Sequence, residues 1–266
     1  MSEHQYIAAG EKDEAELNRL RILERIFDPQ IKRHLDMIGV SEGWKCFEAG
    51  AGSGSVAQWL STRVGPTGKV VATDVNIRFL RLLSAPNLEI RQLDMIKDEV
   101  EKGHYDLVYC RTLLMQLPEP EKALKKMADA LHPGGWLLIE EFDWGSELSV
   151  DVTNPSSAVF TTTLRAMADF LRKRGMVDPY FGREGRRLLE KLGLVDVKHE
   201  GWTCMVRGGE PLARFDGATL QMASKPMIAA GLLKQEDLES VQRLLQDPTF
   251  SYPGPPMFSA WGKKPV

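Results

Sequence analysis

The sequence predicts an α/β protein with a mostly parallel sheet covered by helices on both faces, and three observations lead to this fold class. Strand-like apolar segments alternate with helical patterns between residues 45 and 140. A glycine-rich segment, residues 50–54, separates the first strand from the first helix that follows it. The chain has 266 residues and contains no repeat. This length can bury a core large enough for one such domain.

The N-terminal region is predicted to be helical over residues 11–38, because apolar residues recur there at spacings of three and four among charges. Asp28 and Pro29 are expected to end one helix and to start a second, with Asp28 as the N-cap and Pro29 at the first helical position. The second helix is expected to run to about Ile38 and to stop at Gly39. We therefore assign residues 1–39 to N-terminal helices.

Residues 40–145 are predicted to form the ligand-binding core. Its five expected strands cover residues 45–48, 69–73, 88–92, 105–110 and 136–140. Its expected helices follow the glycine segment through Leu60, then cover residues 77–83 and 119–131.

After Asp143 the pattern changes from alternating strands and helices to mainly helices. Helices are expected over residues 156–174, 184–192 and 210–246, and the last of these is expected to be interrupted at Pro211, Pro226 and Gly231. A sixth strand is expected at residues 195–199 and a final strand at 257–261. Residues 146–256 are therefore assigned to lid insertions, helices and strand 6, and residues 257–266 to the last strand. The whole chain, 1–266, is expected to form one domain.

The sharpest feature is the segment Glu48-Ala49-Gly50-Ala51-Gly52-Ser53-Gly54, which lies between a strand and a helix. Glycines at such a place permit a tight turn and let a ligand lie against the backbone at a helix N-terminus. A dinucleotide fingerprint would need a glycine or alanine at the sixth position from Gly50, where this chain has Ser55. An NAD(P)-dependent oxidoreductase therefore stays only as an alternative.

The E-x-G-x-G-x-G pattern resembles motif I of the class I S-adenosylmethionine (SAM)-dependent methyltransferases. The resemblance continues in order over residues 40–145 through VVATDVN, QLDM, YDLVYCRTLLMQLP and LHPGGWLLIEEFDW. The most similar groups are the ubiquinone/menaquinone-biosynthesis-like and natural-product small-molecule methyltransferases. The resemblance implies a Rossmann-like, doubly wound sheet of seven strands with an antiparallel last strand. It also implies methyl transfer from SAM, with S-adenosylhomocysteine (SAH) as the product.

Two carboxylates follow consecutive strands beside the glycine segment. By resemblance, Asp74 accepts both ribose hydroxyls, and Asp94, beside the apolar Met95, accepts from the adenine amino group. A carboxylate suits a vicinal diol because it offers two acceptor oxygens. The cofactor-binding residues that the resemblance implies are Glu48, Ala49, Gly50, Gly52, Gly54, Asp74, Val75, Asp94, Met95, Cys110 and Arg111.

Catalytic residues are not assigned by the motifs. A base is needed only if the acceptor arrives protonated, and the candidates are Glu141 and Asp143 after the fifth strand and His199 in the sixth. Each has a plain structural alternative. Related enzymes often carry a histidine after motif IV, where this chain has Gln116, which cannot take a proton.

The acceptor is expected to be a partly apolar small molecule, methylated at oxygen or nitrogen more readily than at carbon. The near-neutral charge of −3 and the absence of the post-strand motifs of nucleic-acid methyltransferases argue against nucleic acid. No acid follows the fourth strand as in the metal-dependent catechol enzymes, so no metal is expected. The acceptor pocket is expected among the aromatic and methionine residues of the lid: Phe160, Met167, Phe170, Tyr180, Phe181, Trp202, Met222 and Met227.

The cellular context is predicted from absences in the sequence. Three scattered cysteines, no long apolar run and an acidic N-terminus predict a cytoplasmic protein without a membrane span. A homodimer is left open as the assembly. A second functional alternative also stays open, namely a SAM-binding protein that does not methylate and uses the pocket for regulatory, pericyclic or structural work.

Overall fold

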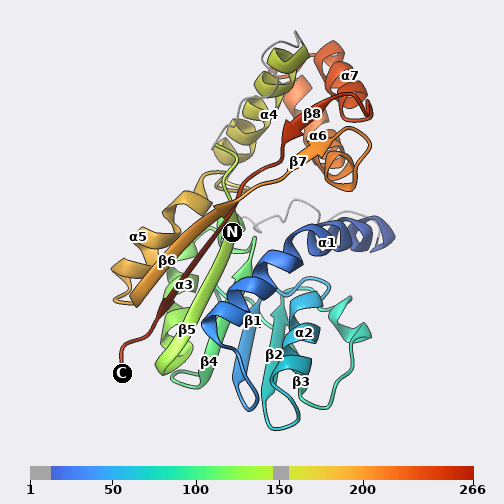
Figure 1. Ribbon diagram of the computed structural model, residues 1–266. Coiled ribbons are helices and arrows are strands. Elements are labelled where there is room, and N and C mark those ends of the chain that lie inside the picture. The colour runs from blue at the N-terminus through green and yellow to red at the C-terminus, as the bar shows by residue number, and fades with distance from the viewer. Residues whose placement is uncertain (1–12, 146–155) are drawn as a thin grey trace.

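The computed structural model describes residues 13–145 and 156–266 and contains a seven-stranded sheet with helices on both faces (Figure 1). The order of strands across this sheet is β3-β2-β1-β4-β5-β9-β6. The strands of the sheet are β1 (Lys45–Ala49), β2 (Lys69–Asp74), β3 (Leu88–Gln92), β4 (Tyr105–Arg111), β5 (Leu131–Phe142), β6 (Val195–Trp202) and β9 (Met257–Lys263). A separate antiparallel pair, β7 (Met205–Arg207) and β8 (Ser251–Pro253), was not predicted from the sequence.

The sheet reverses its order between β1 and β4. The first five strands are parallel, with β1 paired to β2 on one side and to β4 on the other. The last strand, β9, is antiparallel to both β5 and β6, as the resemblance implies. Open α/β sheets bind ligands at the carboxyl ends of the strands where the order reverses. The predicted fold class is thus confirmed, and the site is expected beyond β1 and β4.

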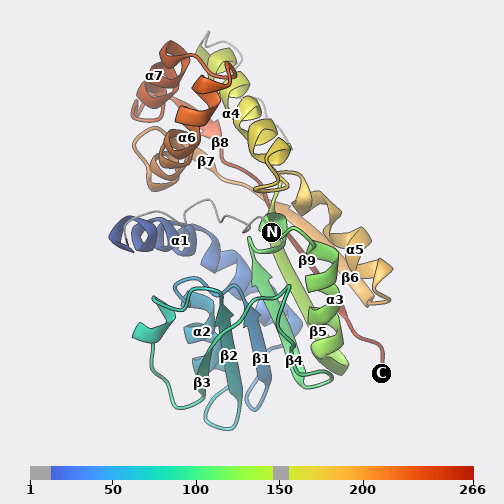
Figure 2. The ribbon, with the colours of Figure 1, turned by 180° about the vertical axis from the view of Figure 1, so that it is seen from behind.

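Two hydrophobic cores hold the helices against the sheet. On one face, α1 (Asp13–Ile38) and α2 (Ser55–Arg63) pack through Ile31, Leu35 and Leu60 against the buried residues of β1 and β2. On the other face lie α3 (Pro120–Ala130) and α5 (Gly185–Lys191), which Figure 2 brings to the front. Helices on both faces are what a parallel sheet needs to bury its two apolar surfaces.

The predicted break at Asp28 and Pro29 is wrong. A single helix, α1, runs from Asp13 to Ile38 with Pro29 inside it. A proline inside a helix costs about 3 kcal/mol, but here buried Phe27 and Ile31 pack on both sides of it. Asp28 is not an N-cap, because its carboxylate accepts hydrogen bonds from the side chains of other elements. Tertiary packing therefore overrides the local signal.

Two further helix predictions also need correction. The expected helix over 77–83 is only a 3₁₀ turn, η1 (Leu80–Leu82), in which Leu80 is buried while Leu82 is exposed. Pro226 does not interrupt its helix, since α6 (Pro211–Ala229) continues through it. The predicted stop at Gly231 is confirmed, because this residue follows the end of α6 with a φ of 69°.

The lid consists of α4 (Ser156–Lys173), α6, α7 (Gln235–Leu244) and the β7–β8 pair. It lies beyond the carboxyl ends of the parallel strands, with α1 running between the lid and the sheet (Figure 1). Contact between the lid and α1 includes the Arg19 guanidinium carbon, which lies 5.6 Å from the centre of the Phe215 ring. Within the two described ranges, no helix is long and apolar enough to cross a membrane.

Candidate active site

The glycine segment after β1 forms a tight loop at the point where the sheet order reverses. Gly50, Gly52 and Gly54 have φ angles of 68°, 60° and 86°, which side-chain-bearing residues rarely adopt. The Gly52 N–H donates to Asp74 Oδ2 at 3.0 Å, which ties the loop to the end of β2. A Cβ atom at Gly54 would overlap with the Leu83 and Leu80 side chains. The loop therefore depends on glycine for both backbone angle and space.

Glu48 lies at this loop with an unsatisfied oxygen. Only 4% of the residue is exposed, and among the described residues Glu48 Oε2 has no hydrogen-bond partner. Burial raises the pKa of Glu48 to about 8, although the nearby Arg111 guanidinium favours the ionised form. An orphaned buried acceptor of this kind carries a desolvation cost. A ligand that donates to Glu48, such as an ammonium group, would remove that cost.

Asp74 ends β2 directly beside the loop. Its two oxygens accept from the Gly52 N–H at 3.0 Å and from the Asn76 N–H at 2.9 Å. Each carboxylate oxygen has a second lone pair, so both can still accept from a ligand. Burial raises the pKa of Asp74, while the two N–H donors oppose that shift. The next residue, Val75, is 58% exposed and offers a bare apolar surface beside the carboxylate.

Asp94 follows β3 and adjoins Asp74, because the Leu93 N–H donates to the Asp74 carbonyl at 3.0 Å. Its Oδ1 accepts from the Ile96 N–H at 2.9 Å, and its Oδ2 lies 3.1 Å from Lys97 Nζ. Burial opposes ionisation, but these donors lower the pKa of Asp94 overall. Since the Lys97 side chain is 80% exposed, it can leave Oδ2 to a ligand. The neighbouring Met95 is buried in the core.

The end of β4 lies opposite the end of β1. Cys110 pairs with Ala49 in the sheet and is fully buried, and burial raises the pKa of its thiol well above the usual range. Arg111 Nη1 donates to Asp28 Oδ1 at 3.0 Å. Thr112 then has a φ of 48°, a strained value for a β-branched residue and one that clusters at functional sites. No signal in the sequence identified Thr112.

Helix α1 covers the glycine loop with residues spaced four apart. The Leu20 side chain lies 3.5 Å from where a Cβ of Gly52 would be. The next residue on this face, Glu24, accepts a hydrogen bond from Ser53 Oγ. One turn further, Asp28 Oδ1 accepts from Ser55 Oγ at 3.1 Å. The three-residue stripe was missed in the sequence, although its i, i+4, i+8 spacing was visible there.

Glu141 is held by the backbone after β4. Its carboxylate accepts N–H bonds at distances of 3.1, 2.8 and 3.3 Å from Leu113, Leu114 and Met115. These donors begin the 3₁₀ turn η2 (Leu114–Gln116). Burial raises the pKa of Glu141 to about 8, while the three N–H groups favour the ionised form. The geometry therefore directs this carboxylate at the protein backbone.

Asp143 is likewise held by protein groups. Its oxygens accept from Arg183 Nε at 2.7 Å and Nη2 at 2.8 Å, and the Gly145 N–H donates to Oδ1 at 2.9 Å. This bidentate pair joins the end of β5 to the turn η3 (Phe181–Glu184). The third acid of this segment, Glu140, accepts from Ser259 Oγ at 2.7 Å and is fully buried between strands.

The remaining candidates differ in their distance from the loop. His199 lies four strands away from Ala49 at the same level of the sheet, which is about 19 Å at 4.8 Å per strand. Its Nε2 lies 3.0 Å from the Gly182 carbonyl, and burial lowers its pKa. The structure does not bring His199 to the glycine loop. Gln116, by contrast, lies close by and donates through Nε2 to the Thr112 carbonyl.

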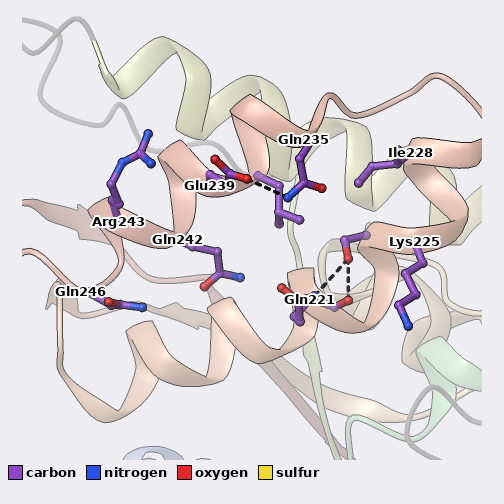
Figure 3. A pocket seen from close by; sticks show the side chains of 10 residues that line it. Gln221, Lys225, Ile228, Gln235, Glu239, Gln242, Arg243 and Gln246 are labelled. Carbon is purple, nitrogen blue, oxygen red and sulfur yellow. Dashed lines mark hydrogen bonds between the residues drawn. The ribbon is translucent and has the colours of Figure 1, made fainter.

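Two cavities border the lid, and the larger is the less suitable as a site. A groove of ≈490 Å³ lies between α6 and α7 and is lined by polar side chains such as Gln221, Lys225 and Gln242 (Figure 3). None of its lining residues comes from the sheet or its loops. A second cavity of ≈110 Å³ is lined by residues of α4 and α6, by Trp144, two residues beyond β5, and by the segment before β9.

Two of the residues predicted to form the acceptor pocket line the second cavity. They are Phe160 and Met167, both on α4. Three of the other predicted residues are buried in the hydrophobic core, namely Phe170, Phe181 and Met227. The Tyr180 ring forms cation–π contacts with the guanidinium groups of Arg172 and Arg183. Within the described ranges, no three His, Cys, Asp or Glu side chains are arranged to hold a metal ion.

Sequence comparisons agree with this architecture. A family model described as a methyltransferase domain matches residues 11–199. The chain is similar to methyltransferase str2 of Strobilurus tenacellus, with 28% identity over 67% of this chain and 63% of that protein. It is also similar to the ubiquinone/menaquinone biosynthesis C-methyltransferase UbiE of Pseudomonas putida, with 35% identity over 41% of this chain and 45% of UbiE. The matched regions thus span about half to two thirds of these relatives.

Solved structures share the fold at low sequence identity. A putative methyltransferase from Bacillus halodurans has a TM-score of 0.57 and 17% identity, over 88% of this chain and 98% of that one. Phosphoethanolamine N-methyltransferase 2 of Haemonchus contortus, solved with phosphomonomethylethanolamine and SAH, has a TM-score of 0.62 and 13% identity, over 100% of this chain and 61% of that one. Together with the family match over more than half of its length, these findings show that the chain belongs to the methyltransferase-domain family and has the class I SAM-dependent methyltransferase fold.

Proposed function

We propose that the protein transfers the methyl group of SAM to an oxygen or nitrogen atom of a small molecule. The observation that carries this proposal is the orphaned Oε2 atom of Glu48, buried at a three-glycine loop where the sheet order reverses. A cationic ligand with a hydrogen-bond donor suits this position, since Arg111 already pairs with Asp28. The ammonium group of SAM is such a donor.

The surrounding residues fit the other parts of SAM. When bound, SAM supplies a methyl group activated by a sulfonium. Asp74 would accept from the ribose hydroxyls through the free lone pairs of both oxygens. Val75 would pack against the adenine with its exposed side chain, and Asp94 would accept from the adenine amino group at Oδ2. The backbone of Cys110 and Arg111 would border the methionine portion.

The protein's chemical task is positioning. Methyl transfer from a sulfonium needs the acceptor atom in line and water excluded, which held geometry can supply. Helix α1 would exclude water, because Leu20, Glu24 and Asp28 lie over the loop. We propose that Glu141 and Asp143 are positioning residues, because their oxygens already accept from backbone N–H groups and Arg183.

Carbon is the second candidate for the methylated atom. The relatives with 35% identity are named C-methyltransferases, although the match covers only 41% of this chain. Neither choice requires a base when the acceptor carries a free lone pair or an activated carbon. We also propose a cytoplasmic location and a homodimeric assembly, and neither proposal is derived from the geometry of the site.

Two titrations and one product assay test the function. The protein is titrated by calorimetry with SAH and, separately, with NADH. It is then incubated with methyl-labelled SAM and fractionated metabolite extract, and the label is followed into small molecules. We expect SAH binding, no NADH binding and label in at least one small-molecule fraction.

Each outcome separates the proposal from its alternatives. Tight NADH binding without SAH binding would favour the oxidoreductase. SAH binding with no label in any fraction would favour a SAM-binding protein that does not methylate. The variant Asp36→Ala is a suitable control, because Asp36 is exposed on α1 and its ion pair in the described ranges is with the surface residue Arg63.

A further inference from the structure

The ≈110 Å³ cavity of the lid is a small aromatic pocket. Four aromatic side chains contribute to its wall: Trp144, Phe160, Phe215 and Tyr252. Phe160 and Tyr252 pack with their ring centres 4.7 Å apart. An engineered apolar cavity of about 150 Å³ holds one benzene molecule, so the lid cavity, at ≈110 Å³, has room for at most one small ring.

One carboxyl group interrupts the apolar wall. Asp216 Oδ2 accepts from the Tyr252 hydroxyl at 2.6 Å, and in the described part of the chain no donor reaches its other oxygen, Oδ1. The hydroxyls of Thr161 and Thr219 also line the wall, and Thr219 Oγ1 donates to the Phe215 carbonyl at 2.9 Å within α6. Asp216 Oδ1 is the carboxyl oxygen that this wall offers to a ligand. Burial raises the pKa of Asp216 to about 7, and the Tyr252 hydroxyl only partly offsets that shift.

The pocket lies on the side of the lid that faces the candidate cofactor site. Trp144 lines it two residues beyond β5, and the Asp143 N–H donates at 3.0 Å to the carbonyl of Pro256, another lining residue. Phe215 contacts Arg19 of α1, and the next residue of α1, Leu20, covers Gly52. A ligand held in the pocket can therefore extend toward the carboxyl ends of the strands.

We propose that this pocket is the recognition site for one end of the methyl acceptor, and that it takes a ring-sized apolar group whose hydroxyl donates to Asp216 Oδ1. The proposal rests on the proposed function. An anionic group is disfavoured because Asp216 would repel it. An ammonium group is disfavoured because the guanidinium group of Arg165 lines the same wall and carries a like charge.

Fragment binding to the full chain tests the assignment. Phenol, toluene and benzylammonium are titrated by ligand-observed NMR into SAH-saturated wild type, Asp216→Asn and the control Glu236→Gln. Glu236 is exposed on α7, so this control makes the same charge change elsewhere in the lid. At pH 8.5, above the raised pKa of Asp216, we expect phenol to bind the wild type about tenfold more tightly than toluene, the contribution of one hydrogen bond to a charged acceptor.

The variants test whether the phenol hydroxyl donates a hydrogen bond to Asp216. Asp216→Asn is expected to lower the affinity for phenol about tenfold and to leave the affinity for toluene unchanged. Unchanged toluene binding also shows that the pocket is intact in this variant. Glu236→Gln should change neither affinity. A second variant, Leu164→Trp, fills the pocket from α4 and should remove binding of both rings, so the assignment stays testable if Asp216→Asn does not fold.

Three outcomes would overturn the proposal: equal binding of phenol and toluene, phenol binding that Asp216→Asn does not weaken, or benzylammonium as the tightest fragment. The last would indicate an ammonium pocket. Calorimetry with SAH on the same samples separates this proposal from the proposed function. If SAH binds but phenol does not bind more tightly than toluene, only the pocket assignment fails. If SAH does not bind, the proposed function fails, and the same phenol titrations without SAH still decide whether the pocket recognises phenol through Asp216.

Discussion

The loop region at the carboxyl ends of β1, β2 and β4 and the pocket of the lid are built in different ways. The loop region is made of backbone N–H groups and carboxylates whose positions follow from strand register, as in the bond from Gly52 to Asp74. The lid pocket is made of aromatic side chains brought together by helix packing, with one carboxyl group among them. The first arrangement is suited to a polar cofactor, and the second to a mostly apolar acceptor.

Both regions contain a carboxyl oxygen without a protein donor in the described structure, Glu48 Oε2 and Asp216 Oδ1. Their surroundings differ. Glu48 lies near Arg111 but also near three acids that raise its pKa, namely Asp28, Glu24 and Asp74. Asp216, in the described part of the chain, has Tyr252 as its hydrogen-bond partner. A cation therefore suits Glu48, and a neutral donor suits Asp216. The predictions below test this division of roles.

The largest effect is expected from Asp74→Ala on cofactor affinity. Two hydrogen bonds to a charged group contribute about 3–6 kcal/mol together, so SAH affinity should fall about 100-fold or more. Calorimetric titration measures it. The lid variant Asp216→Asn should leave SAH affinity unchanged. An unaltered affinity in Asp74→Ala would contradict the assignment of the ribose to the loop region.

A smaller effect is expected from alanine at a glycine of each region. Gly54→Ala should lower the free energy of unfolding by about 2–4 kcal/mol, because it adds a left-handed backbone cost to an overlap with Leu83 and Leu80. Gly231→Ala in the lid has a similar φ but no atom within 4 Å, so about 1–2 kcal/mol is expected. Urea unfolding measures both. Equal losses in the free energy of unfolding of the two variants would indicate that the overlap with Leu83 and Leu80 adds no cost at Gly54.

The smallest effect is a pH-dependent gain in stability from Glu48→Gln. The folded-state pKa of Glu48 is about 8, well above the unfolded value of about 4. The folded protein therefore binds this proton more tightly, and stability falls as pH rises from about 4 to about 8. Without ligand, Glu48→Gln should melt about 2 °C or more above wild type at pH 8.5.

The control for this measurement is the same pair of proteins at pH 5. There Glu48 is mostly protonated in the folded state, so the difference in melting temperature should be smaller than at pH 8.5. The lid variant Asp216→Asn should behave similarly, with its gain complete near pH 7, because the pKa of Asp216 is raised to about 7. A pH-independent difference at Glu48 would show that its carboxyl is not held in the protonated form.

The sequence predicted the loop region well, because strand-end rules place its residues. The glycines, Asp74 and Asp94 follow consecutive strands, and parallel strands bring their carboxyl ends to one edge. It could not predict the continuous α1, since contacts at Asp28 override the local effect of Pro29. Nor could it predict the Asp216–Tyr252 pair, whose members are 36 residues apart and meet only through lid packing.

The candidates for catalysis illustrate the same limit. The position of Glu141 at the end of β5 was predictable from the strand pattern, but its capture by backbone N–H groups depends on the turn after β4. His199 was placed in the right strand, but the sheet order puts that strand at the far edge. Strand order is a tertiary property that one sequence does not specify locally.

The central claim is that Glu48 receives the cationic end of the cofactor, and proton release on SAH binding tests it most directly. Calorimetry at pH 7 in buffers of different ionisation enthalpy counts the protons released. Because the pKa of Glu48 is about 8 without ligand, an ammonium group beside it should expel about one proton. We expect about one proton released from wild type and none from Glu48→Gln. Equal proton release from both proteins, or none from wild type, would contradict the claim.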